Sequence, residues 1–286
     1  MTAAAGGPVG FGARLTAAME QHGRLCVGLD PHPGMLASWG LSDDAAGLRE
    51  FGHRVIGAAA GRAGVIKPQV AFFEHYGVSG MQALAEIQQE AREAGLLVVA
   101  DAKRGDIGST MAAYAEAWLN PESEFAADAL TVTPFLGFGS LSPAVEAAQR
   151  YGAGLFVLAL TSNPEGHEVQ LAQREQVTVT EQIVRAVAQA DGGSAERQGR
   201  LADIGLVVGA TTAGLAAEHG IDLTAGSVPI LAPGYGAQGA TAQSLRDDFG
   251  SAYSQVLVNA SRSILAAGPD EAALAGAVEK TAAELV

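Results

Sequence analysis

The segment Asp101-Ala-Lys103-Arg-Gly-Asp106 places a lysine between carboxylates. Asp101 and Lys103 are two residues apart, so on a strand both side chains point to the same face. Asp106 follows Gly105, which lets the loop turn and bring a second carboxylate back. A lysine between carboxylates keeps its proton, which suits proton donation rather than Schiff-base formation, a reaction that needs a neutral amine. The alternative interpretation is an ordinary solvated ion pair at a strand end.

Lysine is scarce in this chain, and two of its three lysines end apolar segments. Lys67 closes Val65-Ile-Lys67-Pro68 and Lys103 follows Leu96-Leu-Val-Val-Ala100, whereas Lys280 lies in the C-terminal helical segment. Asp30 similarly follows an apolar run. Taken singly, Lys67 reads equally well as a surface lysine and Asp30 as a turn former. Together at successive strand ends, two Asp and two Lys are suited to an anionic ligand that carries hydroxyl groups.

Two later segments have the composition of a phosphate site. The glycine-rich turn Pro233-Gly-Tyr-Gly-Ala-Gln238-Gly can present backbone N–H groups to an anion, and Arg262 supplies a forked cationic donor. In parallel barrels, the loops after strands seven and eight often bind phosphate. We therefore expect Pro233, Gln238 and Arg262 to bind a phosphate group. A plain surface turn is the alternative for the glycine-rich segment.

Composition excludes several classes of function. A net charge of -14 argues against nucleic-acid or anionic-membrane partners, and 48% hydrophobic residues are enough for a large core. The P-loop, the zinc motif H-E-x-x-H and an early G-x-G-x-x-G are missing from the sequence. We predict no metal site, because the six His are scattered and His32, although near Asp30, is better explained as structural. The single Cys26 is predicted to be a buried hydrophobe, and the lack of a signal peptide or long apolar run predicts a cytoplasmic protein.

Eight short apolar runs alternate with helical segments, a pattern typical of parallel strands covered by helices. The strands are expected at 25–29, 64–67, 96–100, 129–132, 154–160, 204–208, 228–231 and 255–258. The helices are expected at 43–60, 79–94, 108–118, 141–151, 170–190, 211–219, 240–248 and 269–285. We predict an α/β fold, a (β/α)8 TIM barrel with an additional N-terminal helix; an open doubly wound sheet has the same local pattern.

The segments outside the eight repeated units are expected to be an N-terminal extension and a surface loop. Residues 1–286 are expected to form a single barrel domain in which 1–9 are flexible and 10–22 form the added helix. The polar, glycine-containing segment 191–200 is expected to be a surface loop. In such a barrel the site lies where strands end and the following loops begin, which is where the charged residues above are found.

The chain resembles the orotidine 5'-phosphate decarboxylase family in its longer bacterial form. The segments that carry the resemblance run nearly end to end: Val27-Gly-Leu-Asp30-Pro, Ile66-Lys67-Pro-Gln-Val-Ala-Phe-Phe-Glu74, Asp101-Ala-Lys103-Arg-Gly-Asp106-Ile-Gly-Ser-Thr110, Thr133-Pro-Phe-Leu-Gly137, Leu160-Thr-Ser-Asn-Pro-Glu-Gly166, Pro233-Gly-Tyr-Gly-Ala-Gln238-Gly and Asn259-Ala-Ser-Arg262-Ser. The resemblance implies a (β/α)8 homodimer with shared active sites. It also implies conversion of orotidine 5'-phosphate to UMP and CO2 in de novo pyrimidine synthesis, without metal or organic cofactor.

The resemblance also implies roles for individual residues. Lys103 would donate a proton to C6 and Asp101 would face the substrate carboxylate. Lys67 and Asp106 would complete the charged array, with Asp106 and Thr110 reaching across from the partner subunit. The substrate-binding residues would be Asp30 for the ribose, Ser162 for the pyrimidine, and Pro233, Gln238 and Arg262 for the phosphate. The alternatives are a metal-dependent 3-keto-sugar-phosphate decarboxylase of the same superfamily and a non-catalytic barrel that binds a phosphate ligand.

Overall fold

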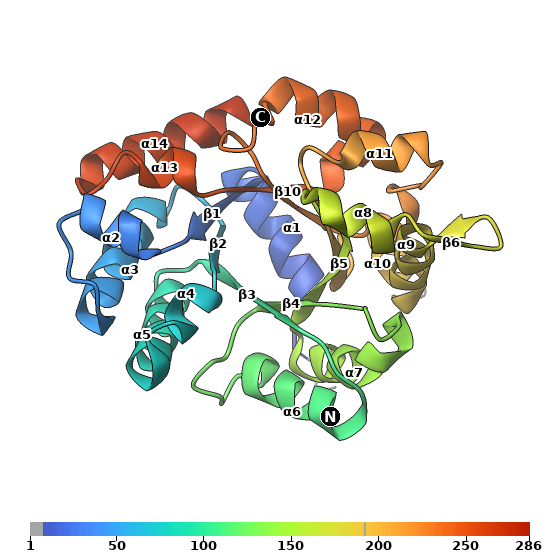
Figure 1. Ribbon diagram of the computed structural model, residues 1–286, viewed down its shortest axis with the longest axis horizontal. Coiled ribbons are helices and arrows are strands. Elements are labelled where there is room, and N and C mark those ends of the chain that lie inside the picture. Colours follow the sequence, from blue (N-terminus) through green and yellow to red (C-terminus); the bar gives the residue numbers. More distant parts are fainter. Residues whose placement is uncertain (1–7, 192) are drawn as a thin grey trace, which may run out of the picture.

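The computed structural model describes residues 8–191 and 193–286, and in these residues eight parallel strands close into a barrel (Figure 1). The order around the barrel is β1 (Leu25–Leu29), β2 (Val65–Pro68), β3 (Leu97–Arg104), β4 (Ala129–Val132), β5 (Gly154–Leu160), β8 (Ile204–Val208), β9 (Ile230–Pro233) and β10 (Val256–Ala260). β10 pairs with β1, so the sheet has no edge and the open doubly wound alternative is wrong. The predicted TIM barrel is confirmed.

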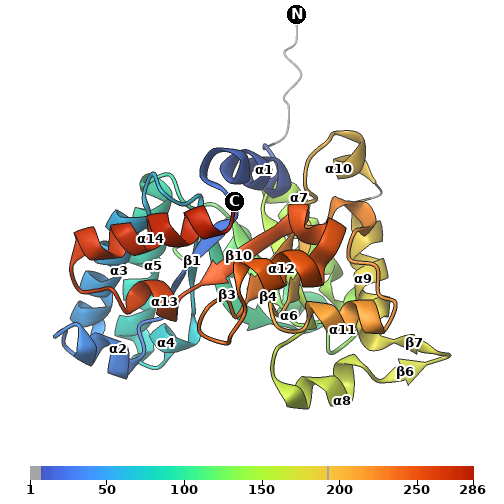
Figure 2. The ribbon, with the colours of Figure 1, turned by 90° about the horizontal axis from the view of Figure 1, so that it is seen from above.

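Most of the helices surround the barrel and cover the outer face of its strands (Figures 1 and 2). They are α1 (Phe11–His22), α2 (Pro33–Ser38), α3 (Ala45–Ala59), α4 (Ala71–Glu74), α5 (Gly77–Glu93), α6 (Gly108–Leu119), α7 (Ser142–Tyr151), α8 (His167–Gln170), α9 (Val179–Ala190), α10 (Ser194–Arg197), α11 (Ala213–Glu218), α12 (Ala242–Phe249), α13 (Arg262–Leu265) and α14 (Glu271–Glu284). Local chemistry sets several of these ends. Asp44 and Asp270 each accept a hydrogen bond from a first-turn amide, of α3 and α14 respectively.

The expected helix over 170–190 is wrong in its first half. There the chain forms α8 and then an antiparallel hairpin of β6 (Gln173–Arg174) and β7 (Val177–Thr178), and α9 begins only at Val179. Glu175 and Gln176 have φ angles of 53° and 67°, which is the left-handed conformation of a two-residue hairpin turn. The expected surface loop over 191–200 contains the short helix α10. Three predicted strands also shift by two residues or more at an end: β3 extends to Arg104, β9 begins at Ile230 and β10 extends to Ala260.

The predicted N-terminal helix is α1, and it closes one end of the barrel. Phe11 and Leu15 are fully buried against side chains of the barrel interior, and the Phe11 ring meets that of Phe156 edge to face with 5.9 Å between centroids. Figure 2 shows α1 at the end opposite to α8 and the β6–β7 hairpin. Of the segment expected to be flexible, residues 1–7 lie outside the described residues. α1 therefore packs its apolar side chains against this end of the barrel interior.

Cys26 lies inside the barrel on β1, as expected for a small buried hydrophobe. Its side chain is fully buried in the interior cluster that also contains Val65, Val99 and Leu257. Burial raises the pKa of its thiol to about 12, so the thiolate that would react is scarce at neutral pH. No helix among the described residues has both the length and the apolar character needed to cross a membrane.

Candidate active site

A pocket of about 470 Å³ opens at the carboxyl ends of the barrel strands. Alternation along the strands explains its lining, because residues two positions beyond the interior cluster also point inward. Val65 and Val99 belong to that cluster, and Lys67 and Asp101 accordingly line the pocket. Eight predicted site residues line it: Asp30, Lys67, Asp101, Lys103, Ser162, Pro233, Gln238 and Arg262. Strands distant in sequence therefore bring most of the predicted site together.

The centre of the pocket is a carboxylate held between two ammonium groups. Asp101 Oδ2 lies 2.8 Å from Lys67 Nζ, and Asp101 Oδ1 lies 2.5 Å from Lys103 Nζ. Only 4% of the Lys67 side chain is exposed to solvent, against 47% of the Lys103 side chain. The inner lysine is thus suited to holding Asp101, while the outer one can reach a ligand and exchange protons with water.

Charge pairing determines the protonation of the buried pair. Burial alone would lower the pKa of Lys67, but the charges of Asp101 and Asp30 outweigh it and hold that pKa above its ordinary value. Burial would likewise raise the pKa of Asp101, but the two neighbouring ammonium groups hold it well below its usual range. Lys67 and Asp101 are therefore both charged at neutral pH.

Asp106 and Thr110 are the two predicted site residues that do not line this pocket among the described residues. Asp106 Oδ1 accepts a hydrogen bond from the Ile107 amide, 2.7 Å away, just before α6. The expectation that Gly105 turns Asp106 back toward Lys103 in the same chain is wrong. Gly105 instead packs against Thr133, where a Cβ atom would lie 2.5 Å from the threonine methyl carbon.

Arg104, between the two halves of the motif, points away from the pocket. Its guanidinium forms an ion pair with Glu74 and lies over the rings of Tyr114 and Trp118. Arg104 therefore packs the outer face of β3 against its neighbouring helices. Its charge is not part of the pocket.

Asn259 and Ser261 also line the pocket beside the predicted Asp30, although neither was predicted from the sequence to be a site residue. Asp30 Oδ1, Asn259 Oδ1 and Ser261 Oγ are buried atoms without a hydrogen-bond partner among the described residues. Gly28 makes room for this cluster, since a Cβ atom there would lie 1.8 Å from Ser261 Oγ. Buried polar atoms are normally paired, so these three are available to a ligand. Side chains on β10 point alternately into and out of the barrel, and Leu257 points inward. The same alternation places Asn259, two residues later, in the pocket.

The glycine-rich turn after β9 brings Gln238 to the same pocket. Gly234 has a φ angle of 113°, and a Cβ atom there would lie 2.8 Å from Gln238 Oε1. Only glycine tolerates both conditions, so this backbone can bend under the Gln238 side chain. Arg262 begins α13 beside it and also lines the pocket. Gln238 and Arg262 therefore form the cationic, hydrogen-bonding side of the site.

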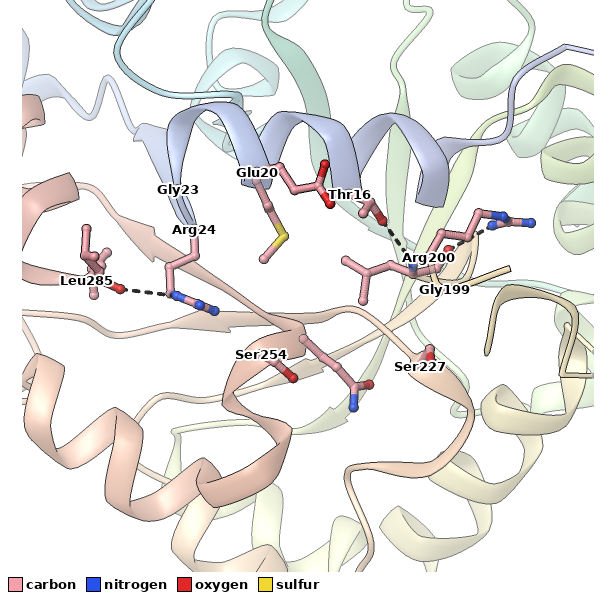
Figure 3. Close-up of a pocket in the computed structure, with 13 residues that line it drawn as sticks. Thr16, Glu20, Gly23, Arg24, Gly199, Arg200, Ser227, Ser254 and Leu285 are labelled. Carbon is pink, nitrogen blue, oxygen red and sulfur yellow. Dashed lines mark hydrogen bonds between the residues drawn. The ribbon is translucent and has the colours of Figure 1, made fainter. Parts of the chain in front are cut away.

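A second cavity, of about 750 Å³, lies at the opposite end of the barrel beneath α1 (Figure 3). Arg24, one of two arginines that line it, donates to the carbonyl oxygens of Leu285 and Tyr253 at 3.2 and 2.6 Å. Thr16 Oγ1 accepts a hydrogen bond from the Leu201 amide across the same space. These contacts tie α1 and the C-terminal helix to the barrel. The chemistry-bearing charges lie at the other end, in the smaller pocket.

Comparison with known proteins gives a consistent assignment. Residues 23–277 match the model of the orotidine 5'-phosphate decarboxylase / HUMPS family. The chain is 52% identical over 276 residues to orotidine 5'-phosphate decarboxylase of Streptomyces coelicolor, covering 96% of each chain, and 50% identical over 275 residues to that of Salinispora arenicola, again covering 96% of each.

Solved structures agree with these sequence matches. A crystal structure of a Streptomyces avermitilis protein, assigned as an orotidine 5'-phosphate decarboxylase, superposes with a TM-score of 0.92 at 50% identity, covering 100% of this chain and 98% of that one. OMP decarboxylase of Leishmania donovani superposes with a TM-score of 0.73 at 30% identity, covering 97% and 98%. The chain belongs to the orotidine 5'-phosphate decarboxylase / HUMPS family.

Proposed function

We propose that this chain is an orotidine 5'-phosphate decarboxylase, which converts orotidine 5'-phosphate to UMP and CO2 in the cytoplasmic synthesis of pyrimidines, without a metal or organic cofactor. The observation that carries the proposal is the array in which Asp101 lies between Lys67 and Lys103 at the floor of the pocket. The identity of the substrate is inferred from the names of relatives that are about 50% identical to this chain. We also infer that the barrel is a single domain.

The proposed chemistry follows from the charges of the array. Loss of CO2 breaks the bond to C6 and leaves its electron pair on that carbon. The Lys103 ammonium stabilises this charge as it develops and then transfers a proton to C6, so that UMP forms and a neutral amine remains. Because the Lys103 side chain is half exposed, water can return the proton. The charged Asp101 holds Lys103 in reach of the reacting carbon.

The remaining predicted residues bind the substrate in this proposal. Asp30 accepts hydrogen bonds from the ribose hydroxyls, which its unpaired buried oxygen supports. Ser162 contacts the pyrimidine edge, and Pro233, Gln238 and Arg262 surround the phosphate. Phosphate binding at a distance from C6 supplies binding energy that orients the base over Lys103.

We further propose a homodimer in which Asp106 and Thr110 enter the partner's pocket. Three large apolar side chains are exposed next to Asp106, with 61% of Ile107, 76% of Phe135 and 55% of Leu136 accessible. Their two loops adjoin through the contact of Gly105 with Thr133. Exposed apolar clusters of this kind typically mark protein interfaces. Burial of this cluster in a dimer would carry Asp106 and Thr110 toward a second copy.

The proposed activity predicts that the purified protein consumes orotidine 5'-phosphate and releases one CO2 for each UMP formed. Substrate loss can be followed by its ultraviolet absorbance. Because the proposed mechanism uses only protein charges, the rate is expected to be unchanged after treatment with EDTA. Activity that is lost with EDTA and restored by a divalent cation would favour the metal-dependent sugar-phosphate alternative. Binding of UMP without any substrate loss would favour a non-catalytic barrel.

A further inference from the structure

Thr131 contacts two members of the charged array, Asp101 and Lys103. It lies on β4 with 1% of its surface exposed, and its side chain points into the pocket. Its hydroxyl donates to Asp101 Oδ1 at 2.9 Å and accepts a hydrogen bond from the Lys103 amide, also at 2.9 Å. One hydroxyl therefore contacts both the carboxylate and the backbone of the residue proposed to donate the proton.

The backbone at Lys103 explains why such a contact is needed. Lys103 has a φ angle of 49°, a conformation that non-glycine residues rarely adopt and that persists only where neighbours hold it. The pairing of β3 with β4 shifts register between Ala100 and Arg104, so Lys103 lies at an interruption of the ladder. The Thr131 side chain takes the place of a backbone acceptor for the Lys103 amide at this interruption.

The same hydroxyl matters to Asp101 during the reaction. Asp101 Oδ1 contacts both Lys103 Nζ and Thr131 Oγ1, while Oδ2 contacts Lys67. When the Lys103 ammonium turns toward C6 and gives up its proton, Oδ1 loses that partner. Thr131 then remains as its donor, so the carboxylate stays hydrogen-bonded and in place.

We propose that Thr131 is a positioning residue for the decarboxylation, holding Asp101 and the strained Lys103 backbone in register for proton transfer. This proposal rests on the proposed function. It adds to that function a residue, Thr131, that neither donates the proton to C6 nor binds the substrate. Loss of the hydroxyl would displace two charged groups at once. Because the displacement affects the reacting geometry, its effect should appear in kcat rather than in KM.

The test compares Thr131→Val, which keeps the shape without the hydroxyl, with Thr131→Ser, which keeps the hydroxyl. We expect Thr131→Val to lower kcat by about 10- to 100-fold with little change in KM, as displacements of about 1 Å do. Thr131→Ser should retain most of the kcat. Thr281→Val is the matched control, since Thr281 is also buried and its hydroxyl donates to the Ala277 carbonyl within α14, its only hydrogen bond among the described residues. Thermal unfolding and UMP binding establish that each variant is folded.

Several outcomes would overturn the proposal. They are an unchanged kcat in Thr131→Val, a rise in KM alone, or an equal loss in Thr131→Ser. If Thr131→Val does not fold, Thr131→Ala replaces it and is expected to show the same loss of kcat. Failure of the proposed function has a different signature, because the unmodified protein would then not consume orotidine 5'-phosphate at all.

Discussion

Replacement of Lys103 by Ala is expected to lower kcat for orotidine 5'-phosphate by at least about 10⁴-fold, because it removes both the proton donor and the charge that stabilises the carbanion. Alanine keeps the Cβ atom, so the left-handed backbone at φ 49° gains no new strain. UMP should still bind, since the phosphate and ribose side of the pocket is unchanged. Substrate absorbance and calorimetric titration with UMP measure the two effects.

Lys280→Ala provides the control for this substitution. Lys280 is exposed on α14 and is the one lysine of the sequence outside the array. Its replacement should leave kcat and KM unchanged. A Lys103→Ala protein that binds UMP and keeps a kcat within tenfold of the unmodified protein would contradict the assigned role.

Mixing two inactive variants is expected to restore activity if the site is shared. Lys103→Ala and Asp106→Ala homodimers should each be inactive. Random re-pairing places half of the chains in mixed dimers, each with one intact site, so about one quarter of the normal activity should return in a two-fold dimer. Activity is measured after subunit exchange has reached equilibrium.

The control for subunit mixing uses a Lys103→Ala/Asp106→Ala double variant. Mixed with Lys103→Ala, it cannot form an intact site and should give no recovery. If the Lys103→Ala and Asp106→Ala mixture also stays inactive although mixed dimers have formed, Asp106 acts within its own chain, and the shared-site proposal is wrong.

Strand periodicity was enough to predict the floor of the pocket. Apolar strands that end in charged residues indicated where Lys67 and Asp101 would lie, because in a closed barrel every strand ends at the same rim. Eight alternating units favoured a barrel but left an open doubly wound sheet possible, and the pairing of β10 with β1 decides between the two. Thr131 was not identified, since it lies within the apolar run of β4, where threonine is common for its β-propensity alone.

The errors arise where tertiary contacts override local preference. Glu175 and Gln176 take left-handed conformations without the Gly or Asn that normally indicates a hairpin turn, so the segment was predicted as a helix. The direction of Asp106 depends on the packing of Gly105 against Thr133, a contact between neighbouring strand ends. The spacing of residue types in the sequence indicates neither the hairpin turn nor the direction of Asp106.

If an ammonium group at position 103 performs the chemistry, chemical restoration of that group should restore activity. Lys103→Cys should be inactive, and alkylation with 2-bromoethylamine converts the cysteine to a lysine analogue with the ammonium restored. The native Cys26 is buried with a thiol pKa of about 12, so the unmodified protein serves as an unreactive control. We predict that decarboxylation returns in proportion to aminoethyl groups added at position 103. Complete modification of a protein that binds UMP but remains inactive would contradict this role of the ammonium group at position 103.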